Sequence, residues 1–264
     1  MSNFHNNCFG QEILEDDSSL VATPRRVPAW KRALDIICVL AALMVWAPLC
    51  VMIAIFIKIV SPGPILFRQK RIGYMGKEFH CLKFRTMKPN ADVGVHRNHL
   101  RQLMTSDKPM KKLDGIGDAR LIRGGSWLRA LGLDELPQLI NVLRGEMSLV
   151  GPRPCVAYEY EMDIPRFGQR CQTLPGLTGL WQVNGKNKTT FEEMMALDLA
   201  YVERQSLFLD CKILVCTAPA IFGQVWDLGS GRKKSARAKP PNTEPGSVPE
   251  TMMRSASLPH MEKT

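Results

Sequence analysis

The chain has 264 residues, a 45% share of hydrophobic residues and a formal net charge of +10. This apolar share excludes a chain that stays unfolded throughout, and the length is enough to bury a sizeable core. The basic surplus favours anionic partners: nucleic acid, acidic lipid headgroups or phosphorylated substrates. The eight cysteines form no CxxC pair, so their spacing excludes a disulfide framework or a cysteine zinc site.

Residues 1–30 lack periodicity and are expected to be a mobile leader. The stretch from residue 33 to residue 57 is apolar except for Asp35 and is long enough for a membrane helix. Pro48 lies past its middle and predicts a bend. The parts before and after Pro48 would rise only about 22 Å and about 14 Å, less than a hydrocarbon core of about 30 Å.

Both flanks of this stretch are basic, which favours the cytoplasmic side for both ends. The flanking residues are Arg25, Arg26, Lys31 and Arg32 before it, and Lys58, Arg68, Lys70 and Arg71 after it. A re-entrant helix over residues 31–60 satisfies both the bend and the charges, and a kinked single span is the alternative. Asp35 can pair with Lys31 or Arg32 one turn earlier.

Two β-leaning runs follow a Ser61-Pro-Gly-Pro break, and Gly73 and Gly76 between them predict a short β-hairpin. In the second run, Lys83 and Arg85 would share one face of the strand. That basic face is either a solvated edge or a phosphate-binding surface. Residues 88–118 then read as a surface loop with one short helix near residues 99–104.

The segment GLDELPQLINVLRGEMSLVGPRP spans residues 132–154, and its apolar spacing predicts a helix that ends at Gly145. Asp134 and Glu135 stand at its head, where acidic side chains favour the helix dipole and can act as caps. The alternative is chemical, because two carboxylates can hold Mg²⁺ and one can attack phosphorus. Arg129 and Arg153 lie nearby in sequence, and guanidinium groups match phosphate oxygens.

Residues 175–191 form a second dense loop, in which Gln182 and Asn184 could read the edge of a base that stacks on Trp181. The alternative for Trp181 is an ordinary core residue. A helix is predicted over residues 191–202, with Asp198 on its apolar stripe, where a carboxylate needs a partner. Residues 207–222 predict a buried or interfacial helix, and residues 229–264 a disordered basic tail.

Six segments, in this order, resemble the small monotopic bacterial phosphoglycosyl transferases over residues 31–226. The segments are KRALDII, GPILFRQKRIG, KFRTM, LDELPQLINVLRGEMSLVGPRP, PGLTGLWQVNGKN and LDLAYVERQSLFLDCKIL. The resemblance implies a predominantly helical α/β fold with a re-entrant membrane helix bent at Pro48, a short β-hairpin and interfacial amphipathic helices. It places the catalytic domain at residues 61–228.

The resemblance also implies a reaction: transfer of a sugar-1-phosphate from a UDP-sugar to polyprenyl (undecaprenyl) phosphate, with release of UMP. Asp134 would attack the β-phosphorus, and Glu135 would be its partner or a ligand of Mg²⁺, with both carboxylates as candidate metal ligands. The site would lie on the cytoplasmic face of the bacterial inner membrane. The product would initiate surface polysaccharide or glycan assembly.

Substrate-binding positions implied by this resemblance or suggested by the residues are Arg129, Arg153, Lys83, Arg85, Gln182, Asn184 and Lys186. Two positions depart from the family pattern: Ala47 stands where a serine often precedes the bend proline, and Lys186 where an arginine is usual. Membrane lipids are expected as partners, nucleic acid is not, and a homo-oligomer is possible. The competing interpretations are a membrane-tethered basic protein without catalysis and a glycosyl transferase that releases UDP.

Overall fold

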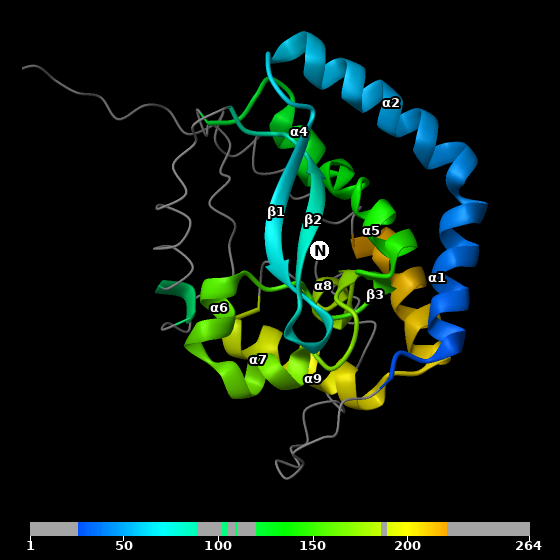
Figure 1. Ribbon diagram of the computed structural model, residues 1–264, viewed down its shortest axis with the longest axis vertical. Coiled ribbons are helices and arrows are strands. Elements are labelled where there is room, and N and C mark those ends of the chain that lie inside the picture. The colour runs from blue at the N-terminus through cyan, green and yellow to red at the C-terminus, as the bar shows by residue number, and fades with distance from the viewer. Residues whose placement is uncertain (1–25, 89–101, 105–108, 110–119, 186–188, 221–264) are drawn as a thin grey trace, which may run out of the picture.

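The computed structural model describes residues 26–88, 102–104, 109, 120–185 and 189–220 (Figure 1). Predictions for residues 1–25, for the tail, for Lys186 and for most of the 88–118 loop fall outside these ranges. The described elements are α1 (Ala29–Ala41), α2 (Leu43–Val60), β1 (Leu66–Ile72), η2 (Tyr74–Gly76), β2 (Glu78–Phe84), α4 (Gly125–Ala130), η3 (Leu133–Glu135), α5 (Gln138–Arg144), β3 (Ser148–Val150), α6 (Ala157–Met162), α7 (Ile164–Arg170), β4 (Gly176–Thr178), α8 (Leu180–Val183), α9 (Phe191–Arg204) and a helix over residues 207–220. The described part is mostly helical, as expected.

The apolar stretch forms two successive helices, α1 and α2, that meet at Ala42 and curve around one side of the domain (Figure 1). The prediction placed the bend at Pro48, but Pro48 lies inside α2 and the helix is interrupted at Ala42. A proline ring clashes with the carbonyl four residues earlier, so the distortion falls on its N-terminal side. Beside the interruption, the Trp46 indole donates to the carbonyl of Val39 at 3.0 Å.

In the described ranges, α2 alone is long and apolar enough to cross a membrane by length and composition. Its inner residues Ile53 and Ile57 pack with Phe84, Ile122 and Leu128 of the domain. Its outward side chains are apolar and exposed: Met44, Val45, Val51, Met52, Ile55 and Ile59. One face of α2 is therefore docked on the domain, and the other is left for an apolar environment.

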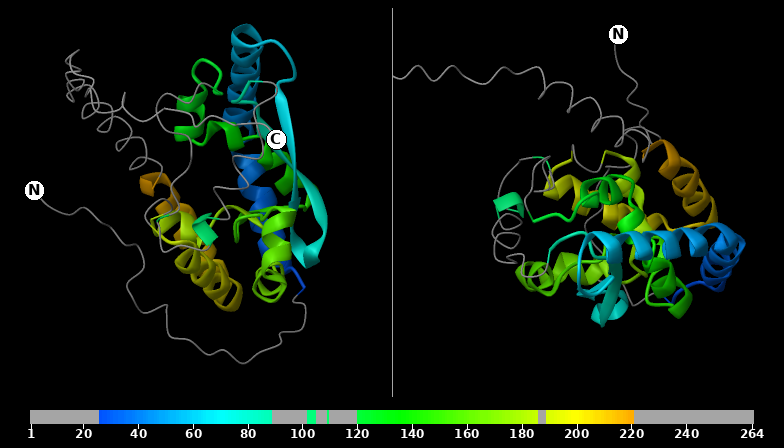
Figure 2. Two further views of the ribbon diagram at one scale, coloured as in Figure 1. Left: turned by 90° about the vertical axis from the view of Figure 1, so that its left-hand side faces the viewer. Right: turned by 90° about the horizontal axis from the view of Figure 1, so that it is seen from above.

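A buried lysine joins the start of α1 to the last described helix, which runs beside α1 (Figure 2). Lys31 is fully buried and its Nζ donates to Asp210 Oδ2 (2.6 Å), Tyr201 Oη (2.9 Å) and Val150 O (2.8 Å). Burial raises the pKa of the Tyr201 hydroxyl far above its ordinary value. The hydroxyl therefore stays protonated and donates to Asp210 Oδ1 at 2.7 Å.

Arg32 and Asp35 also serve the fold. Arg32 donates to Val142 O at 2.9 Å and lies 3.7 Å from the Asp35 carboxylate, which confirms the predicted pairing one turn apart. Asp35 Oδ1 accepts hydrogen bonds from Ser148 Oγ and from the Leu149 N–H at the start of β3. Lys31 and Arg32 were predicted to be surface charges that keep the start of the apolar stretch on the cytoplasmic side of the membrane. That prediction is corrected for both residues, because their side chains bind groups of the domain.

β1 and β2 form the predicted hairpin. The strands are antiparallel, with Leu66 opposite Phe84 and Ile72 opposite Glu78. The connection turns through two left-handed residues, Met75 (φ 58°) and Gly76 (φ 70°). The hairpin extends from the end of α2, past α4, toward α6 and α7 (Figure 1).

The second sheet pairs β3 and β4 in parallel, with Val150 opposite Thr178. Its strands are followed by the two loops that the sequence marked as functional. The backbones approach so closely that a Cβ on Gly176 would lie 2.1 Å from the Gly151 nitrogen. A side chain cannot be accommodated at that separation, so the sheet needs glycine here.

Candidate active site

Asp134 and Glu135 lie in η3, a short turn between α4 and α5. Gly132 leads into it with φ 69°, a left-handed conformation that favours glycine. α5 begins only after Pro137, and no side chain caps it. The acidic pair therefore does not cap α5, but both residues lie in the first turn of η3, where their favourable interaction with the helix dipole stays a prediction. The Asp134 side chain is nearly buried, at 8% exposure, and Glu135 is half-buried.

Lys83 on β2 reaches the acidic pair. Its Nζ lies 2.9 Å from Glu135 Oε1, and both side chains are partly exposed. Lys83 was predicted to bind substrate phosphate, and it stands beside the carboxylate that was predicted to hold a metal. The ammonium offsets part of the repulsion between two adjacent carboxylates.

Arg85 lies just after β2 and is 6% exposed. Its Nη1 donates to Pro62 O at 2.8 Å and its Nη2 to Ser61 O at 2.7 Å, so both groups bind the chain where α2 ends. The predicted solvated basic face is wrong for Arg85. The predicted binding of phosphate by Arg85 stays a prediction. Arg129 lies half-buried on α4, ahead of η3, and its predicted binding of phosphate also stays a prediction.

The segment Gly151-Pro-Arg-Pro is held by buried charges from other elements. Arg170 Nη2 donates to Arg153 O at 2.6 Å and lies 2.7 Å from Asp198 Oδ2. The same Asp198 oxygen accepts the Arg153 N–H at 3.4 Å. Arg71 Nη1 donates to Pro154 O at 3.0 Å. Asp198 thus has the partner that the sequence argument required.

The Arg153 side chain pairs with Glu159 of α6. Its Nη1 lies 3.1 Å from Glu159 Oε1, and Glu159 is fully buried. Burial would raise the pKa of Glu159, but the charges of Arg153 and Arg71 outweigh it and hold the pKa below its ordinary value. Glu159 Oε2 also accepts the Val156 N–H at 2.9 Å.

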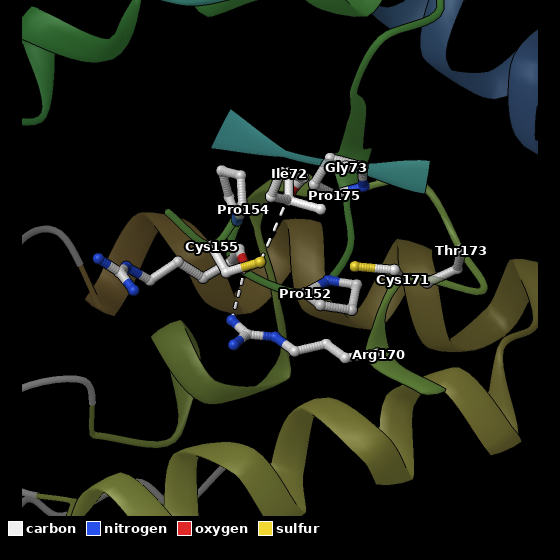
Figure 3. A pocket seen from close by; sticks show the side chains of 10 residues that line it. Ile72, Gly73, Pro152, Pro154, Cys155, Arg170, Cys171, Thr173 and Pro175 are labelled. Atoms are coloured by element: carbon white, nitrogen blue, oxygen red, sulfur yellow. Dashed lines mark hydrogen bonds between the residues drawn. The ribbon is translucent and has the colours of Figure 1, made fainter. Parts of the chain in front are cut away.

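A small pocket lies behind this loop, with Arg170, Cys155 and Cys171 among its lining residues (Figure 3). The two sulfur atoms point toward each other. Every cysteine in the described ranges is a free thiol.

The loop after β4 contributes Gln182 and Asn184. Trp181 is 5% exposed and packs in a core cluster with Phe167 and Phe191, so the core interpretation of this tryptophan is confirmed. Asn184 Nδ2 donates to Leu180 O at 3.0 Å. Gln182 Oε1 is buried without a hydrogen-bond partner, and the base-reading role of both amides stays a prediction.

The acidic pair and the proline-flanked arginine lie against the same β-hairpin. Glu135 pairs with Lys83 of β2. On the other strand, β1, Arg71 donates to Pro154 O and the Ile72 N–H donates to Cys155 O.

No group of three or more His, Cys, Asp and Glu side chains gathers into a metal site within the described ranges. Mg²⁺ is often held by one or two carboxylates while substrate phosphates and water complete its shell. The adjacent carboxylates of Asp134 and Glu135 fit that mode. Mg²⁺ binding stays a prediction.

Sequence reasoning missed three residues that build this region: Asn141, Glu159 and Arg170. Each is buried, and each acts on backbone or on a partner distant in the sequence. Glu159 had a local signal, since its side chain accepts the N–H of the residue three positions earlier. Asn141 lay inside a helix of the predicted pattern, and nothing in the sequence distinguished it from a surface residue.

The family model for bacterial sugar transferases matches residues 26–224, so the chain belongs to that family. Its relatives include the exopolysaccharide production protein ExoY of Rhizobium meliloti, which is 39% identical over 194 residues, or 72% of this chain and 84% of the relative. The predicted resemblance to bacterial phosphoglycosyl transferases is confirmed.

Two further relatives have names that state a reaction. The UDP-glucose:undecaprenyl-phosphate glucose-1-phosphate transferase of Caulobacter vibrioides is 43% identical over 200 residues, or 73% of this chain and 69% of the relative. The undecaprenyl-phosphate galactose phosphotransferase of Salmonella typhimurium is 37% identical over 199 residues, or 73% of this chain and 40% of the relative.

Proposed function

We propose that this protein transfers a sugar-1-phosphate from a UDP-sugar to undecaprenyl phosphate, with release of UMP, and so initiates a surface polysaccharide. The observation that carries this proposal is the acidic pair of η3, paired with Lys83, on a domain that presents the apolar face of α2. The printed activities of the relatives from Caulobacter and Salmonella support the donor and the acceptor.

In the first proposed step, a carboxylate oxygen of Asp134 attacks the β-phosphorus of the UDP-sugar. The bond from that phosphorus to the bridging oxygen breaks, and UMP leaves with that oxygen. A sugar-phosphate ester then remains on Asp134. The nearly buried position of Asp134 limits the access of water to this ester.

In the second proposed step, a phosphate oxygen of the lipid attacks the same phosphorus. The bond to Asp134 breaks, the carboxylate is restored, and undecaprenyl-diphosphate-sugar leaves. A covalent intermediate lets a soluble donor and a lipid acceptor use one site in turn. A site beside the apolar helix α2 would be within reach of the phosphate of a membrane-embedded lipid.

The charge on two phosphorylated substrates must be neutralised for either step. When bound by Asp134 and Glu135, Mg²⁺ would offset the charge of the diphosphate. Lys83 holds Glu135, and Arg129 and Arg153 are proposed to contact phosphate. Gln182, Asn184 and Lys186 are proposed to bind the rest of the donor.

The α1–α2 pair is proposed to enter one leaflet from the cytoplasmic face and return. α1 is tied to the domain by Lys31, and the far half of α2 packs on it through Ile53 and Ile57. Both ends of the pair therefore belong to the same side, which favours re-entry over a span. Leu207, Phe208 and Val215 on the helix over residues 207–220 are also exposed, and we place this helix at the interface.

The reaction is tested with detergent-solubilised protein, Mg²⁺ and a panel of UDP-sugars without lipid. We expect a mass increase of one sugar phosphate on the peptide that carries Asp134. The adduct should vanish when polyprenyl phosphate is added and should be absent from Asp134→Asn. Release of UMP upon lipid addition without any adduct would instead indicate direct transfer, and release of UDP would indicate a glycosyl transferase.

The topology is tested by cysteines placed one at a time at Arg26 and at Lys58 in a chain whose eight native cysteines are replaced by serine. A membrane-impermeant maleimide added to sealed inside-out vesicles should label both positions. Labelling of only one position from that side would establish a span.

A further inference from the structure

The hairpin strand β2 has one edge on β1 and a second edge that faces α5. In the described residues β2 pairs with β1 alone. On the second edge, Asn141 of α5 takes the position of a neighbouring strand. Its Oδ1 accepts the Leu82 N–H at 3.0 Å, and its Nδ2 donates to His80 O at 2.8 Å.

These are the two hydrogen bonds that the N–H and the C=O of one residue in a parallel third strand would make. Asn141 is fully buried. Its remaining amide hydrogen is directed to Glu146 Oε2 at 2.6 Å, so both donors of the carboxamide are used. A carboxamide fixed on three sides sets the position of the strand along α5.

The position of β2 determines where Lys83 points. Lys83 follows Leu82 directly, and a slip of one residue would turn it to the opposite face of the strand. Glu135 precedes α5 on the same continuous segment as Asn141. That segment therefore contacts β2 at two points. Asn141 binds the backbone of β2, and Glu135 binds the side chain of Lys83.

We propose that Asn141 is a positioning residue of the transferase, which acts by fixing the edge of β2 so that Lys83 stands against Glu135 beside Asp134. The proposal rests on the proposed function, since it assigns Lys83 and the acidic pair to the reacting site. Asn141 itself is not proposed to contact substrate.

The test is a double-mutant cycle between Asn141 and Lys83, read as UMP release at saturating donor and acceptor. Asn141→Asp keeps the size of the side chain and its acceptor but loses the donor to His80. Asn141→Ser is the second variant, which leaves room for water at the strand edge. Thr217→Val is the matched control, because it removes a partly buried hydrogen bond to Thr178 away from β2.

Turnover should fall about 10- to 100-fold for Asn141→Asp and for Lys83→Met separately, as expected for a misplaced group. In the Lys83→Met background, Asn141→Asp should cost less than about twofold, because coupled residues are not additive. Its reduction of the melting temperature should be the same in both backgrounds. Thr217→Val should have the same small effect on turnover in both backgrounds.

Losses that multiply in the two backgrounds would overturn the proposal, since they would show a role unrelated to Lys83. Wild-type turnover in both Asn141 variants would overturn it as well. If the wild-type protein releases no UMP, the proposed function fails. Hydrogen exchange at the Leu82 amide then still tests the strand edge: fast exchange only in the Asn141 variants supports it, and unchanged protection overturns it.

Discussion

Two charged regions contact the β1–β2 hairpin, and they use their charges differently. Around Gly151-Pro-Arg-Pro, Arg71 and Arg170 donate to backbone carbonyls, and Arg170 also pairs with the buried Asp198. At η3, Lys83 and Glu135 form a pair that solvent still reaches. A buried network stabilises one geometry, whereas a partly exposed pair can exchange partners when substrate arrives.

The largest expected effect is a loss of turnover at η3 without a loss of stability. Asp134→Asn should lower turnover about 10⁴-fold, since it removes the proposed nucleophile. The free energy of unfolding should stay the same or rise slightly, because one of two repelling carboxylates is lost. UMP release and thermal unfolding measure the two quantities. A large loss of stability would show that Asp134 serves the fold.

The next effect concerns the buried network. Arg170→Met leaves Asp198 buried without its main cationic partner, and we expect a loss of about 3–5 kcal/mol in stability. Arg166→Met on the same helix is the control, since Arg166 pairs with Asp163 and Glu192 at the surface, and should cost less than about 1 kcal/mol. Equal losses in urea unfolding would contradict the distinction between buried and exposed pairs.

A smaller loss of stability is expected from a change in β4, where its backbone approaches Gly151. Gly176→Ala places a Cβ 2.1 Å from the Gly151 nitrogen, so we expect about 1–3 kcal/mol of destabilisation. Gly168→Ala is the matched substitution, because a Cβ there meets no atom within 4 Å and lies within α7. It should stabilise by about 0.5–1 kcal/mol. The two melting temperatures should therefore move in opposite directions.

The smallest effect is a pH dependence of the loop. The pKa of Glu159 lies below its ordinary value when folded, so its contribution to stability is present above the unfolded pKa and is lost as pH falls through the folded pKa. At pH 7 we expect Glu159→Gln to cost about 1–2 kcal/mol. Melting curves from pH 6 to pH 3 should show this difference narrowing at the acid end. A constant difference would rule out the charge of Glu159 as its origin.

Much of the fold followed from local pattern. The hairpin, α5, α9 and the helix over residues 207–220 have apolar spacings and glycine or proline boundaries that any chain of this kind would obey. The need of Asp198 for a partner also followed, because a carboxylate on an apolar stripe is costly. The identity of the partner, Arg170, did not follow, since it depends on the packing of α7 against α9.

The site was predicted at the level of residue type and not of contacts. Lys83 and Arg85 are two positions apart in one predicted strand and looked equivalent in the sequence. In the structure, Lys83 pairs with Glu135, whereas Arg85 donates to the backbone just after α2. Lys31 looked like a surface charge beside an apolar stretch. Its burial depends on Tyr201 and Asp210, which lie 170 and 179 positions later, and no local window contains them.

The long reach of Lys31 sets an order of events during synthesis. α1 and α2 leave the ribosome long before Asp210 exists, so the apolar helix meets the membrane while the lysine at its base still lacks its anionic partner. Completion of the domain thus follows the synthesis of α2, and the arrival of the last described helix joins Lys31 to Asp210. A nascent or truncated chain that ends before Asp210 would be attached to the bilayer but inactive, and the quality control that removes it would have to act at the membrane surface.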